Sequence, residues 1–414
     1  MGNFKYYLTL AARNLWRQRR RTILTFLAVS LGLASFLVAD SLMKGLDKQS
    51  IDNLITLETG ELRLTAPGYI DIKEEDPLKK LLPKDQKLLA LLAEDSEIAG
   101  LAPRLSFPVR VGNGWDEYPQ EAVGIDPVKD TEVFKVKDYL VEGRWPEAGY
   151  EVLISRDTAK ILELGIGDYL LMTTRTKSGA FQAVDMEIVG IVNTVNPNTN
   201  NQVFLPLAAA QEIVGVPDFL SQVDLRLAAG VDAREKAASL KEKIAGAGFQ
   251  VETQPWQEMA EEFLQISKTK NAFIGIFLMM ILLIATVGIV NSILLATIER
   301  TREIGVLKAM GMTEGNIVRL FLVEAALIGL LGSGAGLAIA LAGEYYMVNV
   351  GLDMTEIIGN LDVGYPITGL IKGAWNPGTM VGGFFFCLLV CVLAGILPAR
   401  YGAKKEPIEA LRRV

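Results

Sequence analysis

Residues 271–298 read NAFIGIFLMMILLIATVGIVNSILLATI, 28 consecutive residues without a charged side chain. An α-helix rises about 1.5 Å per residue, so roughly 20 apolar residues cross the hydrocarbon core of a bilayer. Helices in the core of a soluble protein rarely stay uncharged for so long. The stretch therefore predicts a membrane-spanning helix.

Three further segments have the same character, namely residues 22–43, 320–343 and 373–399. The first carries Asp40 near its end, and the second contains Glu324. A cleaved signal peptide is the alternative for residues 22–43, but 21 residues precede this segment and no A-x-A-like site follows it, which favours an uncleaved anchor. The sequence thus predicts an α-helical membrane protein with four transmembrane helices.

The composition excludes several classes of soluble protein. Half of the 414 residues are apolar, and the mean hydropathy is +0.29. The net charge of −7 argues against binding of nucleic acid, which requires a basic face. Because the chain has no histidine, Ser-His-Asp catalysis and His-ligated zinc are excluded. Cys387 and Cys391 lie in an apolar run and indicate packing, so we expect no catalytic, cofactor or metal site.

Lys and Arg are concentrated in alternate flanks of the four segments. Six precede residue 22, four lie in residues 299–319 and five in residues 400–414, whereas residues 344–372 contain one. Cytoplasmic loops carry the excess of positive charge, so both termini are expected in the cytoplasm. Residues 44–270 then form an extracytoplasmic domain, and residues 344–372 form an extracytoplasmic loop.

The extracytoplasmic domain has a mixed α/β (α+β) pattern. A strand–helix–strand order occurs twice, which indicates a weak internal repeat around an insert subdomain at about residues 113–220. The expected elements are 61–65, 84–92 and 107–111 in the first unit and 223–227, 233–245 and 249–252 in the second. Within the insert, strands are expected at 151–154, 169–172 and 187–192, and the Asn-rich residues 193–201 are typical of an exposed loop.

A helix is expected to join this domain to the second membrane span. Trp256, Met259, Phe263 and Ile266 recur at helical spacing, and neither Gly nor Pro interrupts the chain from Trp256 into the span. With a facing helix after the first span, this pattern favours a rigid helical stalk. Two ordinary juxtamembrane helices remain the alternative.

The segments on the cytoplasmic side also have helical patterns. Residues 1–21 are predicted to form an amphipathic helix on the inner leaflet. In residues 299–319, Ile304, Leu307 and Met310 predict an apolar edge on a short helix that Gly311 ends. Such a helix is suited to docking of a cytoplasmic partner, and a plain connector is the alternative.

Two features of residues 320–343 concern packing. Glu324 lies near the cytoplasmic end with no second carboxylate at mid-membrane, so a packing or hydrogen-bonding role is favoured over a proton relay. Gly332 and Gly336 form a GxxxG motif, which predicts close helix packing. A nucleotide-binding loop is not expected there, because no strand precedes the glycines.

Several motifs together resemble the MacB/FtsX-type family of ABC transporter permeases. They are Ala12-Arg13-Asn14-Leu15 with Arg20-Arg21-Thr22, the loop Glu299-Arg300-Thr301-Arg302-Glu303-Ile304-Gly305 through Gly311, Pro398-Ala399-Arg400, the tail Pro407-Ile408-Glu409-Ala410-Leu411-Arg412, and the outer stretches Glu142-Gly143-Arg144 and Leu164-Gly165-Ile166-Gly167-Asp168. They cover nearly the whole chain in the family's order.

The resemblance implies a permease dimer, with itself or with a relative, bound to two cytoplasmic P-loop ATPase subunits in the bacterial cytoplasmic (inner) membrane. ATP-driven closure of the ATPase pair is transmitted to the extracytoplasmic domains (mechanotransmission). The chain has no GxxxxGK[ST] motif, so ATP is expected to bind a separate subunit. The resemblance assigns ATPase coupling to Glu299, Arg300, Arg302, Glu303, Ile304, Leu307, Lys308 and Gly311.

Residues 60–69 resemble the lipoprotein-releasing branch of this family, so a lipoprotein or lipophilic cargo taken from the membrane lipid is expected. Drug or peptide efflux is the alternative within the family, and a division-type permease fits a domain this large less well. A membrane-anchored sensor or scaffold is the alternative from another class. It would not need the loop at residues 299–311 to bind an ATPase.

Overall fold

The protein is described by a computed structural model, which covers all residues except 1, 18, 74, 300, 354–369 and 405–414. The chain divides into two compact units. The first comprises the described parts of residues 1–48, 267–354 and 370–414, and the second comprises residues 49–266.

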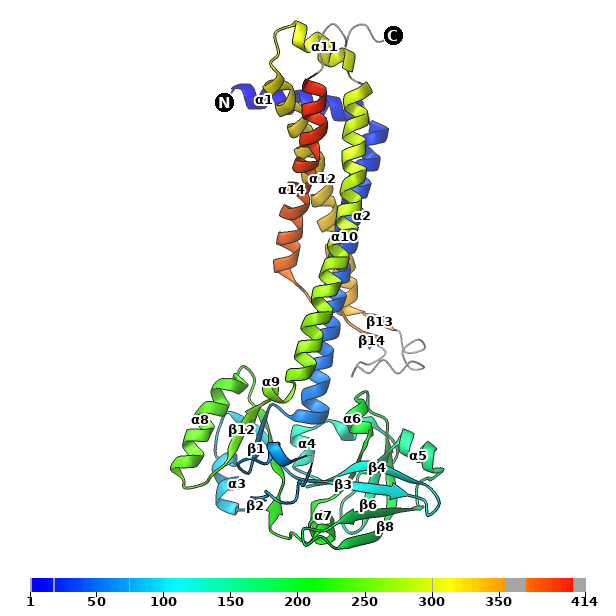
Figure 1. Ribbon diagram of the computed structural model, residues 1–414, viewed down its shortest axis with the longest axis vertical. Helices are drawn as coiled ribbons and strands as arrows, with labels where there is room; N and C mark the ends of the chain where they lie inside the picture. The colour runs from blue at the N-terminus through cyan, green and yellow to red at the C-terminus, as the bar shows by residue number, and fades with distance from the viewer. Residues whose placement is uncertain (1, 18, 74, 300, 354–369, 405–414) are drawn as a thin grey trace. The chain divides into compact units, whose positions relative to one another are not determined.

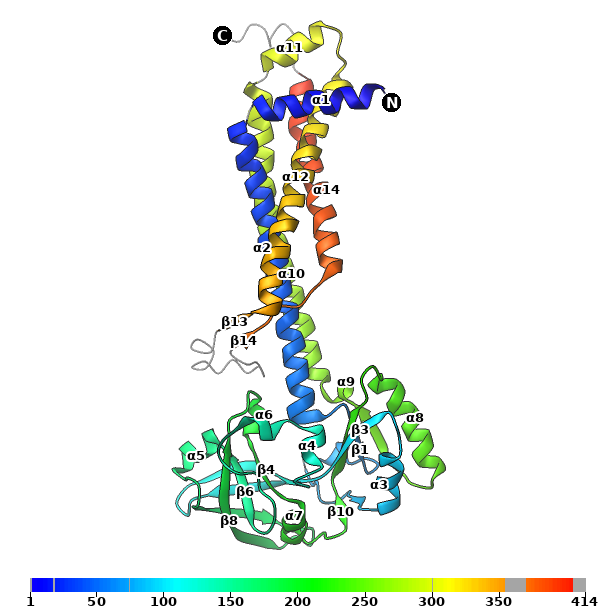
Figure 2. The same ribbon diagram turned by 180° about the vertical axis from the view of Figure 1, so that it is seen from behind.

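Long helices dominate the first unit. In both views α2, α10, α12 and α14 lie side by side, and α1 and α11 lie near one end of them (Figures 1 and 2). The elements are α1 (Gly2–Arg17), α2 (Arg19–Leu54), α10 (Glu261–Glu299), α11 (Thr301–Ala309), α12 (Glu314–Asn349), α14 (Pro377–Ala403) and the strand pair β13 (Leu352–Asp353) and β14 (Leu370–Ile371). The division between the units falls within α2 and α10.

Three helical segments of the described chain are long and apolar enough to cross a membrane. They are Thr22–Thr59, Glu314–Asn349 and Pro377–Tyr401. The first two contain the predicted segments 22–43 and 320–343, and the third contains residues 377–399 of the predicted segment 373–399, because α14 begins at Pro377. The predicted span 271–298 lies in α10, a helix of 39 residues. Many side chains of α10 beyond residue 277 lie outside the described ones, so the count of four spans stays a prediction.

The GxxxG face of α12 lies against α2. A Cβ added to Gly332 would lie 2.8 Å from Val29 Cγ1, and one added to Gly336 would lie 2.7 Å from the Ser30 carbonyl oxygen. On another face, Gly329 approaches Cys391 of α14 in the same way. Only the missing side chains allow the three helices to approach this closely.

The second unit is built on one ten-stranded sheet. The strand order is β12-β1-β11-β3-β4-β9-β6-β8-β5, and β7 pairs with both β3 and β8, so β3, β4, β9, β6, β8 and β7 form a closed ring. The strands are β1 (Leu62–Thr65), β3 (Ile98–Gly112), β4 (Glu117–Ile125), β5 (Leu140–Gly143), β6 (Glu151–Ser155), β7 (Tyr169–Arg175), β8 (Phe181–Val192), β9 (Gln202–Pro206), β11 (Gln222–Leu227) and β12 (Glu252–Pro255), with β2 (Leu82–Pro83) and β10 (Phe219–Leu220) as a separate pair.

Short helices complete this unit, and several begin at a capping side chain. Asp85, Ser155 and Asp232 each accept a hydrogen bond from a backbone N–H of the first turn that follows. The helices are α3 (Gln86–Ala93), α4 (Asp130–Val133), α5 (Arg156–Leu162), α6 (Pro197–Asn200), α7 (Leu207–Val214), α8 (Ala233–Gly246) and α9 (Trp256–Met259), with 3₁₀ turns η2 (Ile70–Ile72) and η3 (Val136–Tyr139) and the π-helical turn η1 (Ile55–Thr59).

Three expectations for this unit need correction. Residues 193–201 are only in part an exposed loop, because they include α6 and because Asn196 and Thr199 are buried against η1. The strand expected at 249–252 lies at 252–255, since the chain leaves α8 through Gly248 at φ +89°. The helix from Trp256 does not run unbroken into α10. It ends at Ala260 (φ −98°, ψ 18°), and the Trp256 N–H, bonded to the Glu61 carbonyl, ties α9 to the sheet.

Candidate functional site

The sequence-predicted docking residues lie on and around α11. Ile304 is buried against Ile317, Phe321 and Ala399, so α11 is fixed to the start of α12 and the end of α14. Its side chain therefore lies inside this cluster and not on an outer edge. Gly311 follows at φ +94°, a backbone conformation that favours glycine and turns the chain into α12.

The outer surface of this segment is apolar with charged neighbours. Met310 is 80% exposed and Val306 is 45% exposed, while Leu307 is half-buried. The spacing of apolar residues in a short helix does not show which face points outward. Val306 was therefore not identified from the sequence as a docking residue.

The charged side chains of this segment form ion pairs. Glu303 pairs with Arg17 of α1 at 2.9 Å, and both of these side chains are exposed. Lys308 pairs with the exposed Glu314 at 3.2 Å, whereas the Lys308 side chain itself is only 11% exposed. Exposed pairs such as that of Glu303 and Arg17 contribute little to stability. Arg300 lies outside the described residues, as do the side chains of Glu299 and Arg302.

Helix α1 packs against α12 at the same end of the bundle. Tyr7 and Ala11 are buried with Leu320, and the Asn14 side-chain amide donates a hydrogen bond of 2.6 Å to Glu324 Oε1. The bond gives the buried Glu324 carboxylate a polar partner, which an ionisable group at this depth requires.

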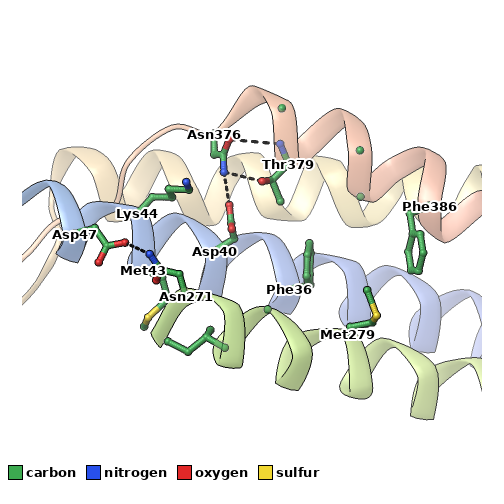
Figure 3. Close-up of a pocket in the computed structure, with 15 residues that line it drawn as sticks. Phe36, Asp40, Met43, Lys44, Asp47, Asn271, Met279, Asn376, Thr379 and Phe386 are labelled. Atoms are coloured by element: carbon green, nitrogen blue, oxygen red, sulfur yellow. Dashed lines mark hydrogen bonds between the residues drawn. The ribbon is translucent and has the colours of Figure 1, made fainter. Parts of the chain in front are cut away.

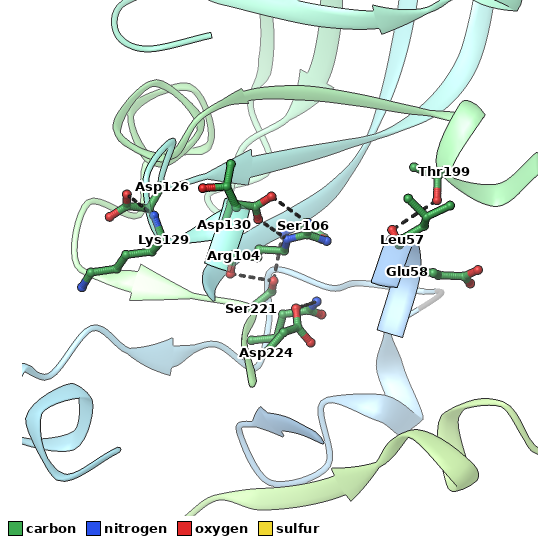
Figure 4. Close-up of polar contacts among 12 residues, drawn as sticks. Leu57, Glu58, Arg104, Ser106, Asp126, Lys129, Asp130, Thr199, Ser221 and Asp224 are labelled. Carbon is green, nitrogen blue, oxygen red and sulfur yellow. Dashed lines mark hydrogen bonds and ion pairs between the residues drawn. The ribbon is translucent and has the colours of Figure 1, made fainter. Parts of the chain in front are cut away.

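At the other end of α2, the π-helical turn η1 is held by the Asn-rich segment of the second unit. The Glu58 carboxylate accepts hydrogen bonds from the side-chain amides of Asn196 (2.8 Å) and Asn198 (3.1 Å). Thr199 Oγ1 donates to the Leu57 carbonyl at 3.3 Å (Figure 4), and Leu57 itself is fully buried. We call η1 together with Asn196, Asn198 and Thr199 the joint.

Buried ion pairs stiffen the sheet next to the joint. The Arg104 guanidinium binds Asp130 through two hydrogen bonds of 2.7 and 3.1 Å and lies 3.4 Å from the centre of the Phe134 ring (Figure 4). Burial raises the pKa of Asp130, and the charge and hydrogen bonds of Arg104 act in the opposite direction.

A second pair links η1 to this region. The Arg63 guanidinium donates to Asp224 at 2.7 Å and to the Glu58 carbonyl at 3.2 Å. These hydrogen bonds connect η1 to β1 and β11, which carry the Arg63 and Asp224 side chains.

The first unit also contains a cavity of about 630 Å³ between α2, α10 and α14. Polar side chains including Asp40, Asp47 and Asn376 gather at one end, and Phe36, Met279 and Phe386 lie toward the other (Figure 3). Across the described residues, no group of three or more Asp, Glu or Cys side chains is placed to hold a metal ion.

Two family models match the chain. The model for a MacB-like periplasmic core domain matches residues 22–243, and that for an FtsX-like permease C-terminal region matches residues 275–407. The first alone covers more than half of the chain.

Individual relatives match along nearly the full chain. An uncharacterised ABC transporter permease of Methanocaldococcus jannaschii is 26% identical over 98% of this chain and 97% of its own length. The macrolide export ATP-binding/permease protein MacB of Psychrobacter arcticus is 24% identical over 95% of this chain, which spans 57% of that protein. The crystal structure of the periplasmic region of MacB from Actinobacillus actinomycetemcomitans covers 52% of this chain, and 97% of its own chain is matched, at 11% identity and a TM-score of 0.38.

Proposed function

The chain belongs to the MacB/FtsX family of ABC transporter permeases, and from this premise we propose that it transmits ATP-driven closure of a separate ATPase to its extracytoplasmic domain. Two copies, or one copy and a related permease, form the dimer, and each binds one P-loop ATPase subunit in the cytoplasm. The four spans lie in the cytoplasmic membrane, and both termini face the cytoplasm.

At the cytoplasmic end, the docking surface is formed by Val306 and Met310, with Glu303 and Lys308 beside them. Exposed apolar side chains rimmed by charges are typical of protein interaction sites. Because Ile304 fixes α11 to α12 and α14, a force applied to α11 reaches the bundle without first bending a loop.

The observation that carries the proposal is the joint. A permease that only anchored a domain would need no specific contacts at the end of α2. Here α2 is continuous from Arg19 to Leu54, and η1 directly after it is fixed by Asn196, Asn198 and Thr199. Motion of α2 along or around its axis is thus delivered to the sheet of the second unit.

For the cargo, we propose a lipoprotein or another lipophilic molecule released from the membrane. Support comes from residues 60–69, which resemble the lipoprotein-releasing branch. Efflux of a drug or peptide is the second candidate, and it is favoured by the macrolide-export proteins that match this chain at 22–24% identity. In both cases the cargo does not need a polar conduit through the spans.

The docking step is tested by replacing the exposed apolar residues. Val306→Asp and Met310→Asp each place an uncompensated carboxylate in the interface, so at least a tenfold loss of co-purifying ATPase is expected, corresponding to roughly 1.4 kcal/mol. Val128→Asp is the matched control, since Val128 is 71% exposed in the second unit. Retention of the ATPase by both docking variants, or purification of the wild type without any ATPase, contradicts the proposal and favours a sensor or scaffold.

A further inference from the structure

The cavity of the first unit has polar side chains at one end and apolar side chains at the other, so its lining is complementary to an amphiphilic molecule. One end is lined by Asp40, Lys44, Asp47, Asn271, Asn376 and Thr379 with Met43 among them, and the other by Phe36, Met279 and Phe386 (Figure 3). All three contributing helices belong to the predicted membrane bundle. Lipid is the solvent around such a bundle, so an acyl chain has access to a cavity of this kind.

The two carboxylates at the polar end differ in how many hydrogen bonds they accept from the protein. Asp47 accepts hydrogen bonds from Lys270, Ser267 and Asn271. Asp40 accepts one bond of 2.7 Å from the Asn376 amide through Oδ2, and its Oδ1 has no hydrogen-bond partner among the described residues. Asp40 can therefore accept a further donor from a molecule in the cavity.

The buried Glu344 lies behind this end and is not part of the cavity lining. Glu344 of α12 is only 2% exposed, its Oε2 has no hydrogen-bond partner in the described part of the chain, and it interacts electrostatically with Asp40. Lys44 is exposed, and Lys270 is engaged by Asp47. An N–H donor at Asp40 satisfies an open acceptor of the lining.

Two glycines of the lining leave open space in the cavity. A Cβ added to Gly275 or Gly382 would meet no atom within 4 Å, although both residues line the cavity. By contrast, a Cβ at the neighbouring Gly383 would lie 3.3 Å from Leu33 Cδ1. A side chain introduced at Gly275 or Gly382 would therefore enter unoccupied space.

We propose that this cavity binds an amphiphile in which an acyl chain is joined to a head group with N–H donors. The chain lies along Phe36, Met279 and Phe386, and the head donates to Asp40. An ethanolamine phospholipid supplies this chemistry through its ammonium group, and the acylated N-terminus of a lipoprotein supplies it through its amide. Binding requires no ATPase and no release step, so the site goes beyond the proposed function and is tested without ATP.

The test uses the full chain in nanodiscs that contain equal amounts of phosphatidylethanolamine and phosphatidylcholine with the same acyl chains. After transfer to detergent, retained lipid is quantified by mass spectrometry. The choline head has no N–H, so the wild type should retain the ethanolamine lipid with a preference of at least about tenfold, because a hydrogen bond to a charged group contributes more than the roughly 1.4 kcal/mol that corresponds to this factor. Asp40→Asn, which has nearly the same shape, should remove this preference.

Gly382→Leu places a side chain in the cavity and should abolish retention of either lipid, whereas Gly334→Leu is the matched control. Gly334 lies in α12, does not line the cavity, and also has open space around its Cβ position. Displacement of the ethanolamine lipid by a triacylated lipopeptide identifies the lipoprotein as a source, and no displacement identifies the phospholipid. Equal retention of both phospholipids by the wild type, or equal retention by Gly382→Leu and Gly334→Leu, overturns the proposal.

Discussion

Replacement of Asn196 by alanine tests whether the joint is a specific mechanical connection. The Asn196 side chain is 2% exposed and makes two contacts: its amide donates to the Glu58 carboxylate at 2.8 Å, and its Oδ1 accepts from the Asn198 N–H at the start of α6. A hydrogen bond to a charged group contributes about 1.5–3 kcal/mol, and a helix cap contributes about 1 kcal/mol. The sum, about 2.5–4 kcal/mol, is the expected loss of local stability at η1.

Asn198→Ala provides the matched control. Asn198 donates to the same carboxylate at 3.1 Å but is exposed, so water replaces the lost bond and the cost stays below about 1 kcal/mol. Amide hydrogen exchange of residues 55–60 in the full chain in nanodiscs measures the difference. Exchange there should be about 60- to 700-fold faster in Asn196→Ala and less than about fivefold faster in Asn198→Ala.

Coupling is measured on the same preparations in complex with the ATPase. Asn196→Ala should retain ATP hydrolysis and lose most cargo release, because α2 then moves without moving the sheet of the second unit. The reasoning is refuted if both variants change exchange at residues 55–60 equally, or if Asn196→Ala exchanges faster and still releases cargo like the wild type.

Two further predictions concern packing and pH. Gly336→Leu places side-chain atoms against the Ser30 carbonyl, and overpacking of this kind costs about 1–3 kcal/mol. The melting temperature of the detergent-solubilised chain should therefore fall by several degrees relative to that of the control Gly334→Leu. Equal melting temperatures of the two variants contradict close packing of α12 on α2. The hydrogen bonds of Arg144 lower the pKa of Glu151 to about 2. The pair therefore stabilises the folded chain at pH values above the pKa of an ordinary glutamate, and this stabilisation is lost as the pH falls toward 2. Arg144→Gln should flatten the melting temperature between pH 4.5 and 2.5, measured on the full chain, and an unchanged slope contradicts this.

The transmembrane elements follow from sequence because charge-free length is a local property. The segments 22–43 and 320–343, and residues 377–399 of the segment 373–399, lie within helices that are long and apolar enough to cross a membrane. Strands such as 223–227 and the helix 233–245 were likewise predictable from their periods.

The joint could not be predicted in this way. Asn and Thr at residues 193–201 have the composition of a loop, and their partner Glu58 lies 138 residues earlier than Asn196 in the chain. Only the tertiary contact shows that these amides bind a carboxylate. The orientation of Ile304 on α11 could not be predicted for a similar reason. An apolar edge on a short helix can face a partner or its own bundle, and here Ile304 faces α12 and α14.

The central claim, transmission of ATPase closure to the extracytoplasmic domains, is tested most directly by a distance between the two second units of the assembled dimer. Spin labels at Val128→Cys, an exposed position of the second unit, report this distance with and without ATP in a complex whose ATPase binds but does not hydrolyse it. The account predicts a shift of the distance distribution on ATP binding that is lost in Asn196→Ala. A distribution that ATP leaves unchanged in the otherwise wild-type complex contradicts it.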